Sequence, residues 1–367
     1  MSTLKVNTIQ DTTGNDALTI DSSGNVTASQ GFVPSTQLSH RNLIINGAMQ
    51  VAQRGTSSTS TGYGSVDRFQ LLKEGLSQFV FTQSQSTTSP DNFTTSFKIN
   101  TDTAEASLDS GDLIRLRHSI EAQNLQHLGF GTSAAKSFTV SFWVRSSVTG
   151  TYAMHFYRPD NTVRNITANY SVSSADTWEY KTITIVGDTS QVVNNDNGEG
   201  MQVHWVLRAG SAFTASDASS WENWDYTGLA YGHTAEWGSA TNDTFHITGV
   251  QLEVGSVATP FEHRSYGEEL ARCERYYQDT GLFRYKLAGR WATNSGNVLC
   301  EYRMSTPMRS APSVSVRTSF QTGDAYVGNP SISGATNKAF LMEGSSSFSA
   351  NAIGYFHNGA LKLDAEL

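Results

Sequence analysis

The segment FHITGVQLEVGSVATPFEHRSYGEELARCERYY, from Phe245 to Tyr277, joins a predicted strand to a predicted helix. Apolar residues alternate with polar ones in its first part, and this alternation changes phase at Gly249. Because successive side chains of a strand point to opposite faces, one strand with a bulge at the glycine accounts for the pattern. The segment therefore closes one globular unit and opens the connection to the next.

A helix is predicted soon after the Val-Ala-Thr-Pro sequence that ends at Pro260. Ser265 precedes Glu268 at the spacing of a capping box, in which a hydroxyl and a carboxylate satisfy free N–H groups of the first turn. Side chains at spacings of four, three and four then form a narrow seam of the coiled-coil type. We expect this seam to be the neck of a trimer, although so short a stripe could also pack only on its own domain. Its members are Tyr266, Leu270, Cys273 and Tyr277.

The composition favours β-structure with many polar turns. Of the 367 residues, 16% are charged and 38% are hydrophobic, and 31 are glycine. The formal net charge of −8 provides no basic field that would hold nucleic acid or an anionic membrane, so neither partner is expected. No apolar run approaches the roughly 20 residues that span a bilayer, so no membrane insertion is expected either. The start of the chain lacks the apolar block of a signal peptide, which predicts synthesis in a cytosol-like compartment.

A short internal repeat marks residues 1–40. The pattern Asp-x-x-Gly-Asn occurs at 11–15 and again at 21–25, and each copy predicts a tight turn between two short strands. A ribbon this thin cannot bury its apolar face alone, so it must pack on copies of itself or on another protein. The alternative is a disordered polar arm, but the alternation in Ala17–Ile20 argues against it.

Residues 41–262 are predicted to form an antiparallel β-sandwich of the jelly-roll type. Strands with a period of two recur there, separated by clusters of Gly, Asn, Asp and Ser. One short helix is expected within Ser119–Gly129. The expected strands are Leu43–Val51, Val66–Leu72, Gln78–Gln83, Thr95–Ile99, Leu113–Leu116, Phe138–Val144, Thr151–Tyr157, Glu179–Val186, Met201–Leu207 and Phe245–Val254.

The remainder of the chain is predicted to be a helical neck over 263–280 and a distal β-rich domain over 281–367. The fold class is thus mainly β, with an N-terminal ribbon, a sandwich, a short neck and a C-terminal head. The Gly-rich and Asn-rich stretch Gly323–Lys338 is expected to be an exposed loop. The expected distal strands are Phe283–Leu287, Val298–Met304, Ser313–Thr318, Ala339–Met342, Ser346–Phe356 and Ala360–Leu367.

No sequence signature of an enzyme or of a metal site is present. The chain has no Gly-rich phosphate loop, no His-Glu-x-x-His and no Gly-x-Ser-x-Gly turn, so we expect no catalytic residue, no metal and no cofactor. Cys273 and Cys300 are too few for a disulfide framework and are expected to be reduced thiols. A pair of carboxylates for glycoside hydrolysis stays open, because their separation cannot be read from a sequence. The candidates are Asp188, Asp196, Glu199, Asp217, Glu222 and Asp225.

An aromatic cluster lies between the strands predicted at Met201–Leu207 and Phe245–Val254. Flat aromatic faces stack on the apolar faces of sugar rings, and neighbouring Asn, Asp and Glu side chains can bind hydroxyls, so a glycan contact is predicted. The alternative is a lid that folds back over the edge of the sandwich, or a subunit interface. The candidate glycan-binding residues are Trp221, Trp224, Tyr226, Tyr231 and Trp237, whereas Trp143, Trp178 and Trp205 are expected in the core.

Six motifs follow one another along the chain: Asn42–Gly55, Val66–Phe69, Phe138–Arg145, Ile247–Gly255, Pro260–Glu262 and Cys273–Tyr277. In their order and spacing they resemble a recurring module of bacteriophage tail fibres and related virion proteins. The opening Leu4–Gly14 is similar to the N-terminal segment of fibres of phages that infect cyanobacteria and other aquatic bacteria. The closing Gly359–Leu367 is similar to the terminal strands of such fibres.

The resemblance implies a homotrimeric, non-enzymatic fibre of the virion that is assembled in the host cytoplasm. Its N-terminus would attach to phage tail or baseplate proteins, and its distal domains would meet a host surface receptor, a polysaccharide. The central module would be a carbohydrate-binding β-sandwich. Two other functions stay open: a tailspike depolymerase that cleaves host polysaccharide, and a structural adaptor or decoration protein of the virion.

Overall fold

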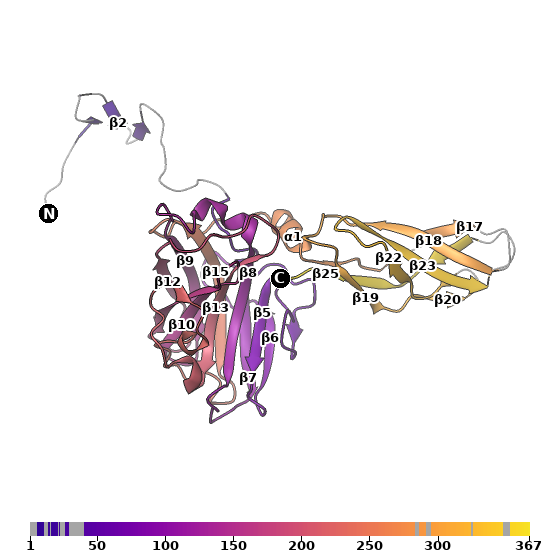
Figure 1. The fold of residues 1–367 in the computed structure, drawn as a ribbon, viewed down its shortest axis with the longest axis horizontal. Coiled ribbons are helices and arrows are strands. Elements are labelled where there is room, and N and C mark those ends of the chain that lie inside the picture. The colour runs from indigo at the N-terminus through magenta and orange to yellow at the C-terminus, as the bar shows by residue number, and fades with distance from the viewer. Residues whose placement is uncertain are drawn as a thin grey trace. The chain divides into compact units, whose positions relative to one another are not determined.

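The computed structural model describes residues 6–10, 14, 16–20, 22, 26–28, 40–282, 286–290, 295–323, 326–347 and 353–367. The chain divides into two compact units, residues 1–41 and 42–367. The fold is mainly β with few helices, as predicted from the sequence (Figure 1). The finer division into four domains stays a prediction.

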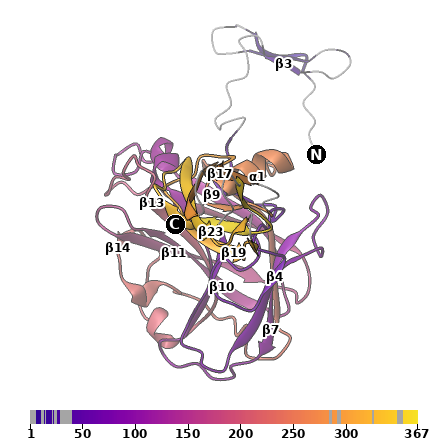
Figure 2. The ribbon, with the colours of Figure 1, turned by 90° about the vertical axis from the view of Figure 1, so that its right-hand side faces the viewer.

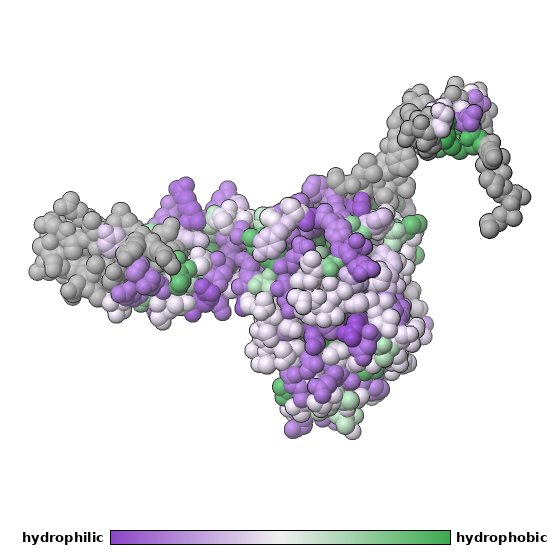
Figure 3. Space-filling view, turned by 180° about the vertical axis from the view of Figure 1, so that it is seen from behind, coloured by the Kyte–Doolittle hydropathy of each residue, from purple (hydrophilic) through white to green (hydrophobic). Residues whose placement is uncertain are grey.

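The first unit contains a three-stranded antiparallel sheet. Its order is β1 (Thr8–Gln10), β2 (Asp16–Ile20) and β3 (Val26–Ala28), so the predicted ribbon of short strands is present. The two predicted turns fall largely outside the described residues. Ile9 of β1 is 47% exposed, and apolar residues gather on one side of the ribbon (Figure 3). The ribbon therefore leaves apolar surface open within its own unit.

Two six-stranded sheets form the sandwich of the second unit (Figures 1 and 2). Except for the short outer strands β4 and β14, their strands are six to eleven residues long and pair antiparallel. The β10 sheet has the order β14 (Glu222–Asn223), β11 (Arg164–Val172), β10 (Gly150–Arg158), β13 (Glu199–Ala209), β8 (Leu113–Glu121) and β5 (Phe69–Glu74). The β9 sheet has the order β12 (Glu179–Ile185), β9 (Phe138–Ser146), β15 (Thr244–Val254), β7 (Ser96–Thr103), β6 (Val80–Ser86) and β4 (Ser57–Ser58).

The core lies between the two sheets because alternate residues of each strand point inward. Phe142 of the β9 sheet and Trp205 of the β10 sheet are both fully buried, and their ring centroids lie 6.0 Å apart in an edge-to-face arrangement. Residues of the opposite parity point to the outer faces. Trp143 therefore faces outward from the β9 sheet, and His204 faces outward from the β10 sheet.

The strand predicted at Leu43–Val51 is wrong. Asn46 adopts φ 62° and Met49 φ 58°, so the segment turns instead of extending. The Asn46 side chain replaces strand pairing, because it accepts a hydrogen bond from the Val51 N–H and donates to the Val51 and Asp67 carbonyls. This buried asparagine satisfies backbone groups that a ladder would otherwise satisfy.

Three strands of the sandwich were not predicted: β4, β11 and β14. In β11 the inward residues Ile166, Ala168 and Tyr170 alternate with polar ones, but the polar members include two asparagines, which are poor strand formers. The helix predicted at Ser119–Gly129 is a short 3-10 helix, Ala122–Leu128, because β8 continues to Glu121. Two further 3-10 turns are Ser211–Phe213 and Tyr226–Gly228.

The bulge and the helix start predicted in the opening segment are confirmed. The pairing of β15 with β9 shifts between Thr248 and Gln251, and Gly249 between them has φ 62°. Ser265 is the N-cap of α1 (Tyr266–Glu274), and its hydroxyl accepts from the Glu268 N–H. No helix in the described part of the chain combines the length and the apolar character needed to cross a membrane.

The predicted helical seam requires a correction. Helix α1 ends at Glu274, and Tyr277 lies beyond it in β16 (Tyr277–Asp279). Cys273 and Tyr277 are 0% and 2% exposed within their own chain, so they are not free to meet another copy. Tyr266 is 57% exposed and Leu270 is half-buried, and a trimer contact through these two residues stays a prediction.

The C-terminal part of the second unit contains three smaller sheets around a core that includes Phe340, Phe356 and Leu363. The predicted loop Gly323–Lys338 contains β21 (Tyr326–Val327) and β22 (Ser331–Ser333). The predicted strand Ser346–Phe356 is the end of β23 (Ala339–Ser347) followed by β24 (Ile353–Phe356). The first sheet has the order β16, β25 (Ala360–Asp364) and β19 (Ser313–Thr318). The second has the order β17 (Lys286–Arg290), β24 (Ile353–Phe356), β21 (Tyr326–Val327) and β20 (Thr322–Gly323). The third has the order β18 (Ser295–Arg303), β23 (Ala339–Ser347) and β22 (Ser331–Ser333).

Candidate functional site

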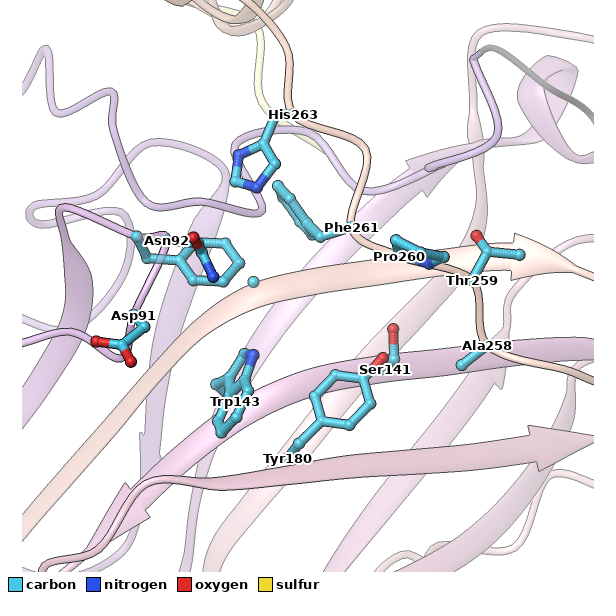
Figure 4. A pocket seen from close by; sticks show the side chains of 12 residues that line it. Asp91, Asn92, Ser141, Trp143, Tyr180, Ala258, Thr259, Pro260, Phe261 and His263 are labelled. Atoms are coloured by element: carbon cyan, nitrogen blue, oxygen red, sulfur yellow. The ribbon is translucent and has the colours of Figure 1, made fainter. Parts of the chain in front are cut away.

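An aromatic groove of about 620 Å³ lies on the outer face of the β9 sheet (Figure 4). Strands β9, β12 and β15 form its floor, and two loop segments form its walls. The lining residues are Asp91, Asn92, Phe93, Ser141, Trp143, Tyr180, Gly249, Ala258, Thr259, Pro260, Phe261 and His263.

Trp143 and Tyr180 form the aromatic floor of the groove. They are directly paired in the register between β9 and β12, and their ring centroids are 5.3 Å apart with an interplanar angle of 48°. Tyr180 is 45% exposed. Because a twisted sheet fixes the position of paired outward side chains, the two rings form a broad apolar surface on rigid strands.

Gly249 shapes the groove through the bulge that it forms. A Cβ atom at this position would lie 2.6 Å from Cζ of Phe93, closer than real Cβ atoms come to a neighbour, and 3.1 Å from Cδ1 of Trp143, which is a tight contact. The missing side chain thus allows the Phe93 ring to lie directly over β15. The bulge that was predicted from the sequence is therefore also the place where the loop ring meets the floor.

Three rings form the wall opposite the floor. The centroids of Phe93 and Phe261 lie 5.1 Å apart, those of Phe261 and His263 lie 4.9 Å apart, and both pairs meet edge to face. Phe93 is fixed at the end of a turn, where its carbonyl accepts from the Ser89 hydroxyl at 2.6 Å. The wall is therefore a packed aromatic cluster and not a set of free side chains.

A buried polar network holds the segment that carries Phe261. Glu253 accepts from the N–H of Thr259 at 2.8 Å and from its hydroxyl at 2.6 Å, and Gln251 accepts from the Glu262 N–H at 2.8 Å. Glu253 and Gln251 are 1% and 0% exposed. Charge-assisted bonds at a buried site are strong, so they fix the wall of the groove to β15.

Polar groups lie at the rim of the groove. Asp91 and Asn92 are exposed at one end and Thr259 lies toward the other, whereas Ser141 is a buried residue of the floor strand β9 (Figure 4). Asp91 is the single carboxylate among the lining residues. The groove can stack on an apolar ligand face and bind hydroxyls at its rim, but its lining lacks the pair of carboxylates that glycoside hydrolysis requires.

The predicted aromatic cluster does not form one site, and two of its members are packed inward. Trp237 is fully buried in the sandwich core, 5.9 Å from Phe79, so the prediction that it contacts a glycan is corrected. Trp221 packs edge to face on Phe130, and its Nε1–H donates to the Val186 carbonyl at 2.7 Å. These two tryptophans pack on the sandwich, as the alternative of a lid that folds back over it predicted.

The other three members lie at or near the surface. Trp224 and Tyr226 are 39% and 54% exposed, and Tyr231 is half-buried. Trp224 contacts Tyr157 on the outer face of the β10 sheet, whereas Tyr226 contacts Phe213. None of the three lines the aromatic groove of the β9 sheet, so their role in glycan binding stays a prediction.

The sequence prediction placed Trp143 in the core and therefore missed the floor of the groove. It also placed Trp178 in the core, although this residue does not line the groove. Both are only half-buried, and Trp178 precedes β12. In β9 the inward residues include Phe142 and Val144, so Trp143 between them has the outward parity. Strict alternation along β9 therefore predicts that Trp143 faces outward. This was missed because apolar residues occur at both inward and outward positions of the strand.

The six candidate carboxylates are largely engaged in structural contacts. Asp188 is 1% exposed and pairs with both Arg158 and Arg164. Asp225 caps a 3-10 turn by accepting from the Thr227 N–H, and this bond lowers the pKa of its carboxyl. Such contacts are typical of turn and core residues.

No known protein family has a profile that matches this chain, and no curated protein matches it. Among solved structures, the enzymatically active domain of tailspike protein 4 of bacteriophage CBA120 is 11% identical, with a TM-score of 0.32. The match covers 58% of this chain but only 21% of the tailspike chain. A sugar-binding protein of Bacteroides thetaiotaomicron, described as putative, is 11% identical over 58% of this chain and 100% of its own, with a TM-score of 0.33.

A family 11 carbohydrate-binding module of Clostridium thermocellum, solved with a mixed-linked tetrasaccharide, is also similar. It is 8% identical over 57% of this chain and 98% of its own, with a TM-score of 0.28. Likeness at this level transfers neither an activity nor a ligand to this chain.

Proposed function

We propose that this chain is a receptor-binding tail fibre protein of a bacteriophage virion that holds a host surface polysaccharide in the aromatic groove. The observation that carries the proposal is the floor formed by Trp143 and Tyr180 on paired strands, faced by the ring of Phe261. Sugar rings present apolar faces to such rings and hydroxyls to a polar rim. Binding without cleavage is proposed because Asp91 is the single carboxylate of the lining.

The motifs that resemble tail fibres support the proposal because they meet in the fold. The Asn42 side chain donates to the Val250 carbonyl at 3.1 Å and accepts from the Leu252 N–H at 3.1 Å. The Asn42 N–H donates to Glu262 at 2.9 Å. Motifs that are more than 200 residues apart therefore form one buried network, which also supports the groove wall.

A homotrimer is proposed on the basis of the N-terminal ribbon. Its sheet has only three short strands, and Ile9 is 47% exposed, so association with other copies would bury apolar surface that the ribbon alone leaves open. Three weak glycan contacts on one fibre would attach far more tightly than one contact. The proposed partners of the N-terminal end are tail or baseplate proteins of the virion.

Retention on immobilised bacterial surface polysaccharides tests the proposed function. We expect the intact protein to be retained on the polysaccharide of a susceptible host, and the Trp143→Ala variant to elute early. We also expect the polysaccharide to keep its chain length after incubation. Shortened products would favour the tailspike depolymerase, and normal adsorption of virions that lack residues 281–367 would favour an adaptor or decoration protein.

A further inference from the structure

We propose that the outer face of the β10 sheet carries a second binding site, which takes one uncharged sugar residue of a glycan. The site is a pocket of about 230 Å³, below the usual size of a drug-like ligand pocket. It lies on the face opposite to the aromatic groove, since the two sheets enclose the core between them. The lining residues are Arg115, His155, Tyr157, Gln202, His204 and Trp224.

Two histidines at the base of this pocket are paired across strands. His155 of β10 and His204 of β13 are in direct register, and their ring centroids are 5.6 Å apart. They are 0% and 2% exposed, and burial is the largest cause that lowers both pKa values, that of His155 to about 3. Both imidazoles are therefore neutral, and each has one N–H and one lone pair.

The tautomer of His155 follows from its neighbour Thr167. The Thr167 hydroxyl has one proton, which it donates to the Gly228 carbonyl at 3.0 Å. It must therefore accept from Nδ1–H of His155, at 2.9 Å. Nε2 of His155 consequently carries the lone pair, and it has no hydrogen-bond partner in the described part of the chain.

The tautomer of His204 follows in the same way from Gln202. The Gln202 amide nitrogen donates to the Glu199 carboxylate at 2.6 Å, so its oxygen faces the histidine. This oxygen accepts from Nε2–H of His204 at 2.8 Å. Nδ1 of His204 is therefore the second lone pair, and no described residue donates to it.

Arg115 complements these two acceptors with a donor. Its Nη2 donates to Glu74 at 2.5 Å, whereas its Nε–H has no acceptor among the described residues. Unsatisfied buried polar atoms are costly, and here three of the residues that line one small pocket each carry such an atom. Two acceptors and one donor match the hydroxyl groups of a sugar, because each hydroxyl both donates and accepts.

Trp224 supplies the apolar wall that a sugar ring requires. Its ring is 39% exposed and packs edge to face on Tyr157, with centroids 4.9 Å apart. The pairing of β14 with β11, where Arg164 lies opposite Asn223, holds this ring beside the pocket. A carboxylate fits less well than a hydroxyl, since both histidines present lone pairs that would repel it and the charge of Arg115 is already balanced by Glu74.

Ligand-observed NMR and titration calorimetry with methyl hexopyranosides of the gluco, galacto, manno and 6-deoxy-galacto configurations test the second site. We expect at least one of them to bind the intact protein and to bind the Trp224→Ala variant at least tenfold more weakly. The Trp178→Ala variant, whose tryptophan lines neither the aromatic groove nor this pocket, should bind it within twofold of the unsubstituted protein. The corresponding methyl uronide should bind more weakly than the neutral sugar.

A direct readout does not depend on any substitution. In imidazole ¹⁵N spectra of the full chain, bound sugar should shift the resonances of Nε2 of His155 and Nδ1 of His204. The proposal is overturned if no glycoside binds, if these resonances stay unchanged, or if Trp143→Ala and not Trp224→Ala removes binding. Loss of polysaccharide retention in Trp143→Ala alone would concern the aromatic groove and leave the second site intact.

Discussion

Arg68 and Glu366 form an ion pair within the second unit, although 298 residues separate them in the chain. The Arg68 side chain is fully buried, lies 3.5 Å above the centre of the Tyr276 ring and donates to the Ser119 carbonyl at 2.6 Å. Glu366 raises the pKa of Arg68 against the effect of burial. The last residues of the chain thus neutralise a charge beside the sandwich.

Replacing Glu366 by Gln should lower the free energy of unfolding by about 3–5 kcal/mol, because it leaves a buried guanidinium without its counter-charge. Chemical denaturation of the purified chain measures this change. The matched control is Glu301→Gln, which breaks a pair with Arg303 whose side chains are 48% and 80% exposed. The control should cost no more than about 0.5 kcal/mol. Equal effects of the two substitutions would contradict the assigned role of Glu366.

Gly249→Ala should destabilise the chain more than Gly281→Ala. The two glycines have φ 62° and 64°, so an alanine carries the same backbone cost of about 1–2 kcal/mol at both. Only at Gly249 would the new Cβ meet Phe93, whereas nothing lies within 4 Å at Gly281. The additional loss should be about 1–3 kcal/mol, with weaker polysaccharide binding, and thermal unfolding of both variants measures it. Identical unfolding curves would mean that Phe93 does not occupy the position described.

Acidification from pH 7 to pH 4 should destabilise the protein. Burial lowers the pKa of His155 and His246 to about 3 and of His233 to about 4, and it lowers those of His118 and His204 as well. Above pH 6.5, the ordinary pKa of histidine, each of these buried imidazoles is neutral in the folded and the unfolded chain. As the pH falls from 6.5 toward the pKa in the folded protein, each histidine lowers the free energy of unfolding by about 1.4 kcal/mol per pH unit.

Two carboxyls act in the opposite direction. Burial raises the pKa of Asp67 to about 6, so protonation of this group in the same range stabilises the fold. Burial also raises the pKa of Asp160, but the five histidines outnumber these two carboxyls, and the melting temperature should therefore fall steadily below pH 6.5. Calorimetry between pH 7.5 and 4.5 checks the sign, and a melting temperature that rises on acidification would contradict it.

Self-association should depend on the N-terminal ribbon. Leu18 and Ile20 lie in β2 and are only partly buried within their own unit. The double substitution Leu18→Asp and Ile20→Asp should convert the proposed trimer into a monomer in multi-angle light scattering. The mass of the Leu270→Asp variant in the same experiment provides the comparison, since α1 is the other predicted contact between copies of the chain. A monomeric mass for the unsubstituted chain would refute the trimer.

The strands and the helix cap could be predicted from the sequence because they depend on local patterns. Alternation located β9 and β15, the phase change located the bulge at Gly249, and the Ser265–Glu268 spacing located the start of α1. The site could not be predicted in this way. Whether Trp143 faces in or out depends on which sheet face is covered, and the ring that faces it, Phe261, is more than 100 residues away.

The same limit explains the error on the aromatic cluster. Trp221, Trp224 and Trp237 are close in sequence, but the long connection distributes them to a sandwich edge, the outer face of the β10 sheet and the core. Nearness along a loop does not fix which face a side chain reaches. The pairing of strands, which does fix it, is a property of the whole fold.

Calorimetric titration of the intact protein with the surface polysaccharide of a susceptible host tests the central claim most directly. The aromatic groove predicts that Trp143→Ala weakens binding at least tenfold, or about 1.4 kcal/mol, with little change in melting temperature. Trp178→Ala is the control, because Trp178 is also half-buried beside the β9 sheet but does not line the groove. Unchanged affinity of Trp143→Ala, or equal losses in both variants, would contradict a glycan site in this groove.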